Sequence, residues 1–156
     1  MQNFTLFKVL RNIIVGGIFL VSFHPANLEI TWLDDFQKAQ ALAQEQNKPI
    51  LMVFSGSDWC KPCILLEKEV FKNQLFQQFA QDKLILLKLD FPRRRKNELS
   101  SEIKIQHETL AETYNPEGAF PRVMLLDKSG KILGIINHQS NQTEEFVNQI
   151  KSLMDH

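Results

Sequence analysis

Two cysteines, Cys60 and Cys63, constrain this chain more than any other feature, because only two residues separate them. A continuous apolar run, Ile50 to Phe54, precedes the pair and is typical of a strand buried on both faces. A helical pattern begins at Cys60. A dithiol at such a strand-to-helix corner indicates redox chemistry, since the positive end of a helix favours a thiolate over a thiol. The spacing therefore predicts thiol–disulfide exchange.

Thiol–disulfide exchange needs one thiol that attacks the substrate and a second thiol that resolves the mixed disulfide. We expect Cys60 to be exposed and ionised and to attack a substrate disulfide, and Cys63 to be more buried and to resolve the mixed disulfide. Lys61 adds a positive charge that modestly favours the Cys60 thiolate. Pro62 suits the first turn of a helix, where its missing N–H would have no partner. Trp59 is expected to shield the pair or to serve in packing.

Two other interpretations of the cysteine pair stay open. A zinc site needs about four ligands. Besides the cysteines the chain offers four histidines, none of them with ligand spacing: His24, His107, His138 and His156. A structural disulfide is the second alternative, although closing so short a loop removes little entropy from the unfolded chain. His107 is expected at the surface of a helix.

The N-terminal segment has the composition of an export signal. Lys8 and Arg11 precede an apolar run, Ile13 to Phe23, as the basic and apolar regions of a signal peptide do. The run is short for a membrane-spanning helix of about 20 residues, unless residues 4–23 all belong to it. We expect residues 1–26 to be a signal peptide or an N-terminal membrane anchor, and the protein to be periplasmic. A buried N-terminal strand or helix is the alternative.

The rest of the chain alternates between strand-like and helical patterns, as one α/β domain does. The expected helices are 31–47, a segment beginning at 60, a short one around 75–79, 99–114 and a last one capped by Asn141 or Thr143; the expected strands are 50–54, 83–90, 123–126 and 131–136. The first two strands should be parallel, and the last two should form an antiparallel hairpin. A chain of 156 residues, 44% of them hydrophobic, is long enough to bury a core of its own.

A basic loop follows the second strand and carries Arg93, Arg94, Arg95 and Lys96. Such a run is most often solvated, and the alternative is contact with an acidic partner or a phosphate group. The formal net charge of the whole chain is zero, which argues against a nucleic-acid partner. The sequence suggests no metal and no cofactor.

These features together resemble the thioredoxin superfamily. The segment Trp59 to Cys63 matches its Trp-Cys-x-Pro-Cys motif, and Phe120-Pro121 stands at the position of its cis-proline. Gly56 to Cys63 and Glu67 to Phe71 are similar to the corresponding segments of exported bacterial thioredoxin-like proteins. The resemblance implies an α/β thioredoxin-like fold, a central mixed β-sheet flanked by helices, over residues 27–156.

The resemblance also implies a function. It predicts a disulfide oxidoreductase that acts on protein disulfides through the Cys60-Lys61-Pro62-Cys63 dithiol, with Pro121 lining the substrate groove. Proteins carrying disulfides or thiols would be its substrates, and a membrane or soluble electron donor its second partner. Family habit and the proline before Cys63 favour a reductase. An oxidase or isomerase with the same site is one alternative, and a non-catalytic binding module that works through the basic loop is another.

Three departures from the family pattern stand out. Phe54 occupies the position of the buried acid that thioredoxins carry six residues before the first cysteine, and Glu67 is a candidate substitute. Arg122 follows Pro121 where threonine is usual, which points to a different substrate preference. The stretch 91–114 is longer and more basic than the minimal fold needs.

Overall fold

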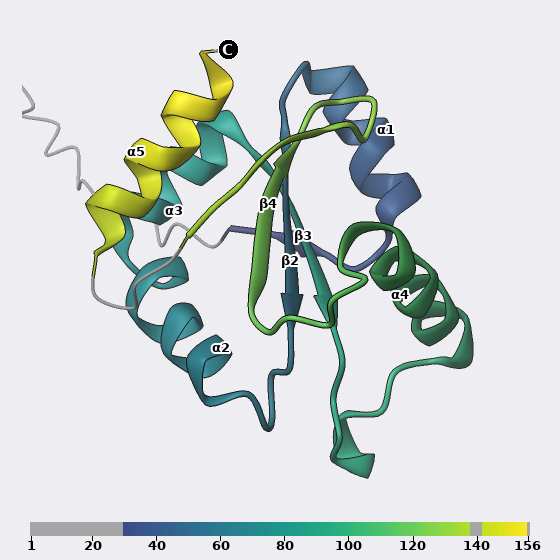
Figure 1. Ribbon diagram of the computed structural model, residues 1–156. Coiled ribbons are helices and arrows are strands. Elements are labelled where there is room, and N and C mark those ends of the chain that lie inside the picture. The colour runs from purple at the N-terminus through teal and green to yellow at the C-terminus, as the bar shows by residue number, and fades with distance from the viewer. Residues whose placement is uncertain (1–29, 138–141, 156) are drawn as a thin grey trace, which may run out of the picture.

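A five-stranded mixed sheet forms the centre of the structure, a computed structural model that describes residues 30–137 and 142–155 (Figure 1). The strands are β1 (Trp32–Leu33), β2 (Ile50–Ser55), β3 (Ile85–Asp90), β4 (Arg122–Leu126) and β5 (Ile132–Ile135), in the spatial order β1-β3-β2-β4-β5. β1 and β2 run parallel to β3, whereas β4 runs antiparallel to β2 and to β5. This confirms the expected fold class.

Helices cover both faces of the sheet (Figure 1). α1 (Phe36–Gln46) and α4 (Ser101–Tyr114) lie on one face. The other face carries α2 (Lys61–Leu66), the π-helical turn η1 (Glu67–Phe71), α3 (Gln74–Lys83) and α5 (Thr143–Met154). Each face has its own apolar cluster, so every residue of β2 is buried, as its unbroken apolar sequence predicts. A short 3₁₀ turn, η2 (Arg95–Asn97), lies in the basic loop.

The beginning of the domain differs from the prediction. The helix expected over 31–47 begins only at Phe36, where the Asp35 side chain caps it by accepting a hydrogen bond from the Lys38 backbone N–H. Trp32 and Leu33 instead pair with β3 as an edge strand. A strand of two residues has no periodicity to recognise, because its only signature is a pairing made with a distant part of the chain.

Two parts of the predicted organisation lie outside the described residues: the N-terminal segment 1–26 and the possible helix cap Asn141. α5 begins at Thr143, but its N-cap residue is Gln142, so Thr143, the other cap position considered, is the first residue of the helix and the prediction that it caps α5 is wrong. Across residues 30–137 and 142–155, no helix is long and apolar enough to cross a membrane.

The topology brings three loops to one edge of the sheet. The parallel strands β2 and β3 end at this edge, and α2 begins beyond the end of β2 (Figure 1). The loop after β3 and the loop that precedes β4 reach the same edge, because β4 runs in the opposite direction. The redox motif, the basic loop and Pro121 are therefore neighbours in space.

Candidate active site

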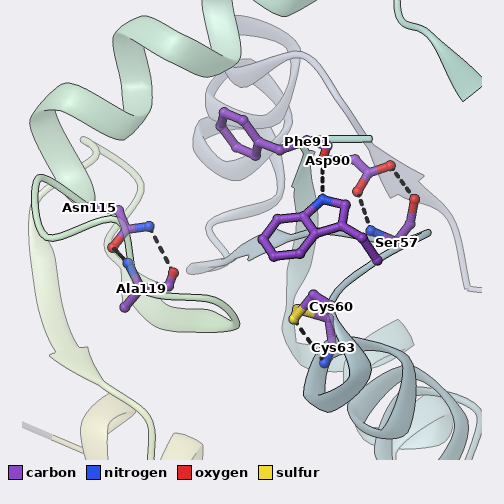
Figure 2. The surroundings of a disulfide bond; sticks show 8 residues. Ser57, Cys60, Cys63, Asp90, Phe91, Asn115 and Ala119 are labelled. Atoms are coloured by element: carbon purple, nitrogen blue, oxygen red, sulfur yellow. Dashed lines mark hydrogen bonds between the residues drawn. A yellow bond between two sulfur atoms is a disulfide. The ribbon is translucent and has the colours of Figure 1, made fainter. Parts of the chain in front are cut away.

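Cys60 and Cys63 form a disulfide at the start of α2, with 5.3 Å between their Cα atoms. Cys60 caps the helix, and its Sγ accepts a hydrogen bond from the backbone N–H of Cys63 at 3.3 Å (Figure 2). Pro62 lies in the first turn, as its sequence position predicts. The structure thus brings the two predicted reactive sulfurs together, and it directs a backbone donor at one of them.

The exposure of the two cysteines differs from the prediction. We expected Cys60 to be exposed and Cys63 to be buried, but in the disulfide-bonded state each is 4% exposed. The accessible surface here belongs to their neighbours: Lys61 and Pro62 are exposed, and Ile64 is 46% exposed. A partner chain would therefore first meet this apolar and cationic rim.

Trp59 is held across the turn that precedes the disulfide, residues 56–59, which we call the redox turn. Its indole N–H donates to the Phe91 carbonyl at 2.7 Å, and its ring meets the Phe120 ring edge-on at a centroid distance of 5.4 Å. Gly56 leaves room for this arrangement, since a Cβ there would stand 2.4 Å from the indole. Trp59 is thus a packing residue that joins the redox turn to the two neighbouring loops.

Asp58 ties the basic loop to the redox turn. Its carboxylate accepts hydrogen bonds from the backbone N–H groups of Arg93 and Arg94 and from the Asn97 side chain, each at 2.9 Å. The Arg93 N–H is the main cause of a pKa of Asp58 below its ordinary value, and the other donors add to it. The Arg93 guanidinium lies 3.8 Å from the centroid of the Trp59 ring. The loop is exposed, as expected, but it is fixed against the motif.

A second carboxylate anchors the same turn from the end of β3. Asp90 accepts hydrogen bonds from the Ser57 backbone N–H at 2.8 Å and from the Ser57 hydroxyl at 2.5 Å (Figure 2). No motif in the sequence predicted Asp58 or Asp90 as part of the site. Each contact joins residues more than thirty positions apart, so no local pattern announces it.

The loop before β4 lies across from the disulfide (Figure 2). The peptide bond between Phe120 and Pro121 is cis, as expected at this position. The side chain of Asn115, which is 3% exposed, holds the loop by donating to the Ala119 carbonyl at 2.9 Å and accepting from the Ala119 N–H at 3.1 Å. No motif in the sequence predicted Asn115 as part of the site.

His107 is buried, and the prediction of a surface position is wrong. The residue is 1% exposed, with Nδ1 at 3.0 Å from the Asp90 carbonyl and Nε2 at 2.8 Å from the Asp34 carbonyl. A sequence signal was available, because His107 stands four residues from both Ile103 and Ala111 on the apolar side of α4. The ring connects α4 to the end of β3 and to the segment before α1.

Two of the three departures from the family pattern concern single positions, Phe54 and Arg122. Phe54 is fully buried and stacks with Phe91 at 6.4 Å, so the position holds apolar core rather than an acid. The Glu67 carboxylate is 2.6 Å from the Lys88 ammonium, and its role as a substitute acid stays a prediction. The Arg122 guanidinium, at the start of β4, is 3.5 Å from the Glu117 carboxylate in the loop that precedes this strand.

In the described part of the chain, no three His, Cys, Asp or Glu side chains gather as a metal site requires. Three of the histidines considered as zinc ligands, His24, His138 and His156, lie outside that part.

Comparison with known proteins adds to this geometry. A family model described as thioredoxin-like matches residues 31–128. The disulfide bond reductase DsbH of Chlamydia pneumoniae is 30% identical over 129 residues, which are 83% of this chain and 74% of that protein. The thioredoxin-related protein DsbJ of the same organism is 35% identical over 66 residues, 42% of this chain and 19% of that protein. A solved structure of a DsbH oxidoreductase superposes with a TM-score of 0.74 at 26% identity, covering 81% of this chain and 85% of the other.

Proposed function

Because the chain belongs to the thioredoxin-like family of thiol–disulfide oxidoreductases, we propose that it reduces disulfide bonds in client proteins through Cys60 and Cys63. The observation that carries the proposal is the hydrogen bond from the Cys63 N–H to Cys60 Sγ. In the reduced protein this donor favours a thiolate at Cys60, and the thiolate is the form that attacks a disulfide. The name of the 30% identical relative, a disulfide bond reductase, supports the direction.

The proposed reaction has two exchange steps. The Cys60 thiolate attacks one sulfur of the client disulfide, which breaks that S–S bond, forms a mixed disulfide and releases the first client thiolate. Cys63 then loses its proton and attacks Cys60 Sγ, which releases the second client thiolate. The client gains two electrons, and its two thiolates take up two protons, one that replaces the proton lost by Cys63 and one from water; the protein is left with the Cys60–Cys63 disulfide. A dithiol electron donor, membrane-bound or soluble, must reduce this disulfide before the next cycle.

The neighbouring residues have supporting roles in the proposal. Trp59 and Pro121 form two walls of the groove that receives the client, and Pro62 starts the helix that presents Cys60. Lys61 is exposed, so its charge contributes only modestly to the Cys60 thiolate.

The reduction potential of the Cys60–Cys63 couple tests the direction of the reaction. Equilibration with glutathione buffers should give a potential near about −270 mV for a reductase, whereas about −120 mV indicates an oxidant. Insulin-disulfide reduction, with Cys60→Ser as the control, tests the activity itself. If Cys60→Ser retained the full activity, the dithiol would not be the reactive centre and a binding module would be the better account.

We further propose that the protein is exported to the periplasm, where clients with disulfides occur. The support is the basic segment with Lys8 and Arg11 ahead of the apolar run 13–23. The intact mass of the protein recovered from the periplasm or membrane would show whether residues 1–26 are removed or kept as an anchor. Recovery of the unprocessed chain from the cytosol contradicts export.

A further inference from the structure

A pocket of about 660 Å³ opens beside the redox turn. One wall is aromatic and consists of Trp59, Phe91 and Phe120. Trp59 and Phe120 directly precede Cys60 and Pro121 in the chain, so the pocket borders both parts of the proposed client groove. Its volume lies in the range of sites that bind ligands, about 300–1,000 Å³.

The rest of the lining is rich in charged side chains. It carries the arginines of residues 93–95 and Lys104. Three carboxylates also line the pocket: Asp90, Glu98 and Glu108. Lys104 lies 4.0 Å from Glu108, and the Asp90 carboxylate already accepts two hydrogen bonds from Ser57. Among residues 30–137 and 142–155, no carboxylate lies within ion-pair distance of an arginine of 93–95.

Two of these arginines are held against the neighbouring turn. Asp58 fixes the backbone at Arg93 and Arg94, and the Arg93 guanidinium carbon lies 3.8 Å from the centroid of the Trp59 ring. A guanidinium stacked on an aromatic ring keeps its N–H groups at the edge, where they can donate in pairs to a carboxylate. The pocket therefore offers an aromatic wall and ordered donors for negative charge.

We propose that this pocket binds an acidic segment of the client polypeptide beside the cysteine that reacts with Cys60. The inference rests on the proposed function and adds a substrate class to it: clients whose reactive cysteine is flanked by Asp or Glu residues. The reacting cysteine must reach Cys60, so the client chain continues past Trp59 or Phe120 into the pocket. The arginines of residues 93–95 are specificity-determining residues in this arrangement.

Two matched disulfide peptides test the proposal. They share one sequence except for the residues beside one cysteine, which are aspartates in the first peptide and glutamines in the second. The reduced full-length protein should react with the acidic peptide about 4- to 25-fold faster in kcat/KM, at about two- to five-fold for each of two exposed ion pairs. The difference should appear in KM and should shrink between about 0.05 and 0.5 M salt.

Variants of the basic loop distinguish binding in the pocket from a general effect of positive charge on the reaction. Arg95→Gln and the double variant R93Q/R95Q should lower the acidic-to-neutral ratio, the double variant more strongly, although Arg94 and Lys104 remain in the lining. Arg95→Glu should invert the preference when lysines replace the aspartates of the peptide. Lys96→Gln removes a charge from the same loop but from outside the pocket lining, so it should leave the ratio unchanged.

The following outcomes would contradict the inference. Equal rates with both peptides, or an equal loss in Lys96→Gln, show that the pocket does not select acidic clients, while the proposed function stands. A preference for oxidised glutathione over the acidic peptide that disappears in R93Q/R95Q assigns the pocket to a small anionic disulfide instead. No exchange with any disulfide refutes the proposed function and the inference with it.

Discussion

Replacement of His107 by leucine should destabilise the domain by about 1–3 kcal/mol. The ring stands between two backbone carbonyls, which only accept hydrogen bonds, and it donates to at least one of them, on Asp90 at 3.0 Å or on Asp34 at 2.8 Å. Leucine fills a similar volume but donates no hydrogen bond, which leaves a partly buried carbonyl unpaired at about 1–3 kcal/mol. At about 4 °C per kcal/mol for a domain of this size, the melting temperature should fall by about 4–12 °C.

Urea unfolding with the disulfide intact measures this cost. The midpoint should fall while the slope of the unfolding free energy against urea stays unchanged. Ile105→Ala is the matched control on the same helix, because Ile105 is 63% exposed and should change the stability by less than about 0.5 kcal/mol. A His107→Leu variant as stable as the control would refute a structural hydrogen bond at this position.

Three further predictions concern the site and its surroundings. Hydrogen bonds lower the pKa of Asp58 in the folded protein. Asp58 therefore anchors the basic loop fully above its pKa in the unfolded chain, about 3.9, and the anchoring is lost as the pH falls through its lower pKa in the folded protein. Trp59 fluorescence in a Trp32→Phe background should therefore change below about pH 4, and a change that persists in Asp58→Asn contradicts this. Gly56→Ala places a Cβ against the Trp59 ring, so it should shift that fluorescence and cost about 1–3 kcal/mol in urea unfolding; an unshifted spectrum would exclude the close contact. Phe54→Asp buries an unpaired carboxylate in the core and should lower the free energy of unfolding by more than about 4 kcal/mol. Phe54→Leu should lower it by only about 1.5 kcal/mol, and equal losses of stability in the two variants would rule out a dry apolar site at this position.

The sequence predicts the framework of the fold because its main elements carry strong local patterns. The apolar run of β2 and the helical spacing of α4 were sufficient to place both elements within a few residues. β1 was missed because its two residues are defined by pairing with β3 alone. Local periodicity thus predicts long elements well and predicts contacts between short, distant segments poorly.

The candidate site shows the same difference between local motifs, which are predictable, and long-range contacts, which are not. The cysteine pair, the tryptophan before it and the position of Pro121 are visible in the sequence, since they belong to short motifs. The residues that fix these motifs in space are not: Asp58, Asp90 and Asn115 act through hydrogen bonds that only the folded chain creates. His107 is an intermediate case, because its spacing placed it on the apolar side of α4 while its residue type suggested the surface.

Trapping of the mixed disulfide tests the central claim most directly. Reduced Cys63→Ser protein, incubated with a disulfide-bonded client such as insulin, should accumulate a covalent adduct through Cys60, which intact mass spectrometry and peptide mapping detect. Cys60→Ser should accumulate little adduct, because a backbone N–H donates to Cys60 Sγ, whereas none in the described part of the chain donates to Cys63 Sγ. Equal adducts in both variants, or an adduct only in Cys60→Ser, would contradict the assignment of Cys60 as the attacking thiol.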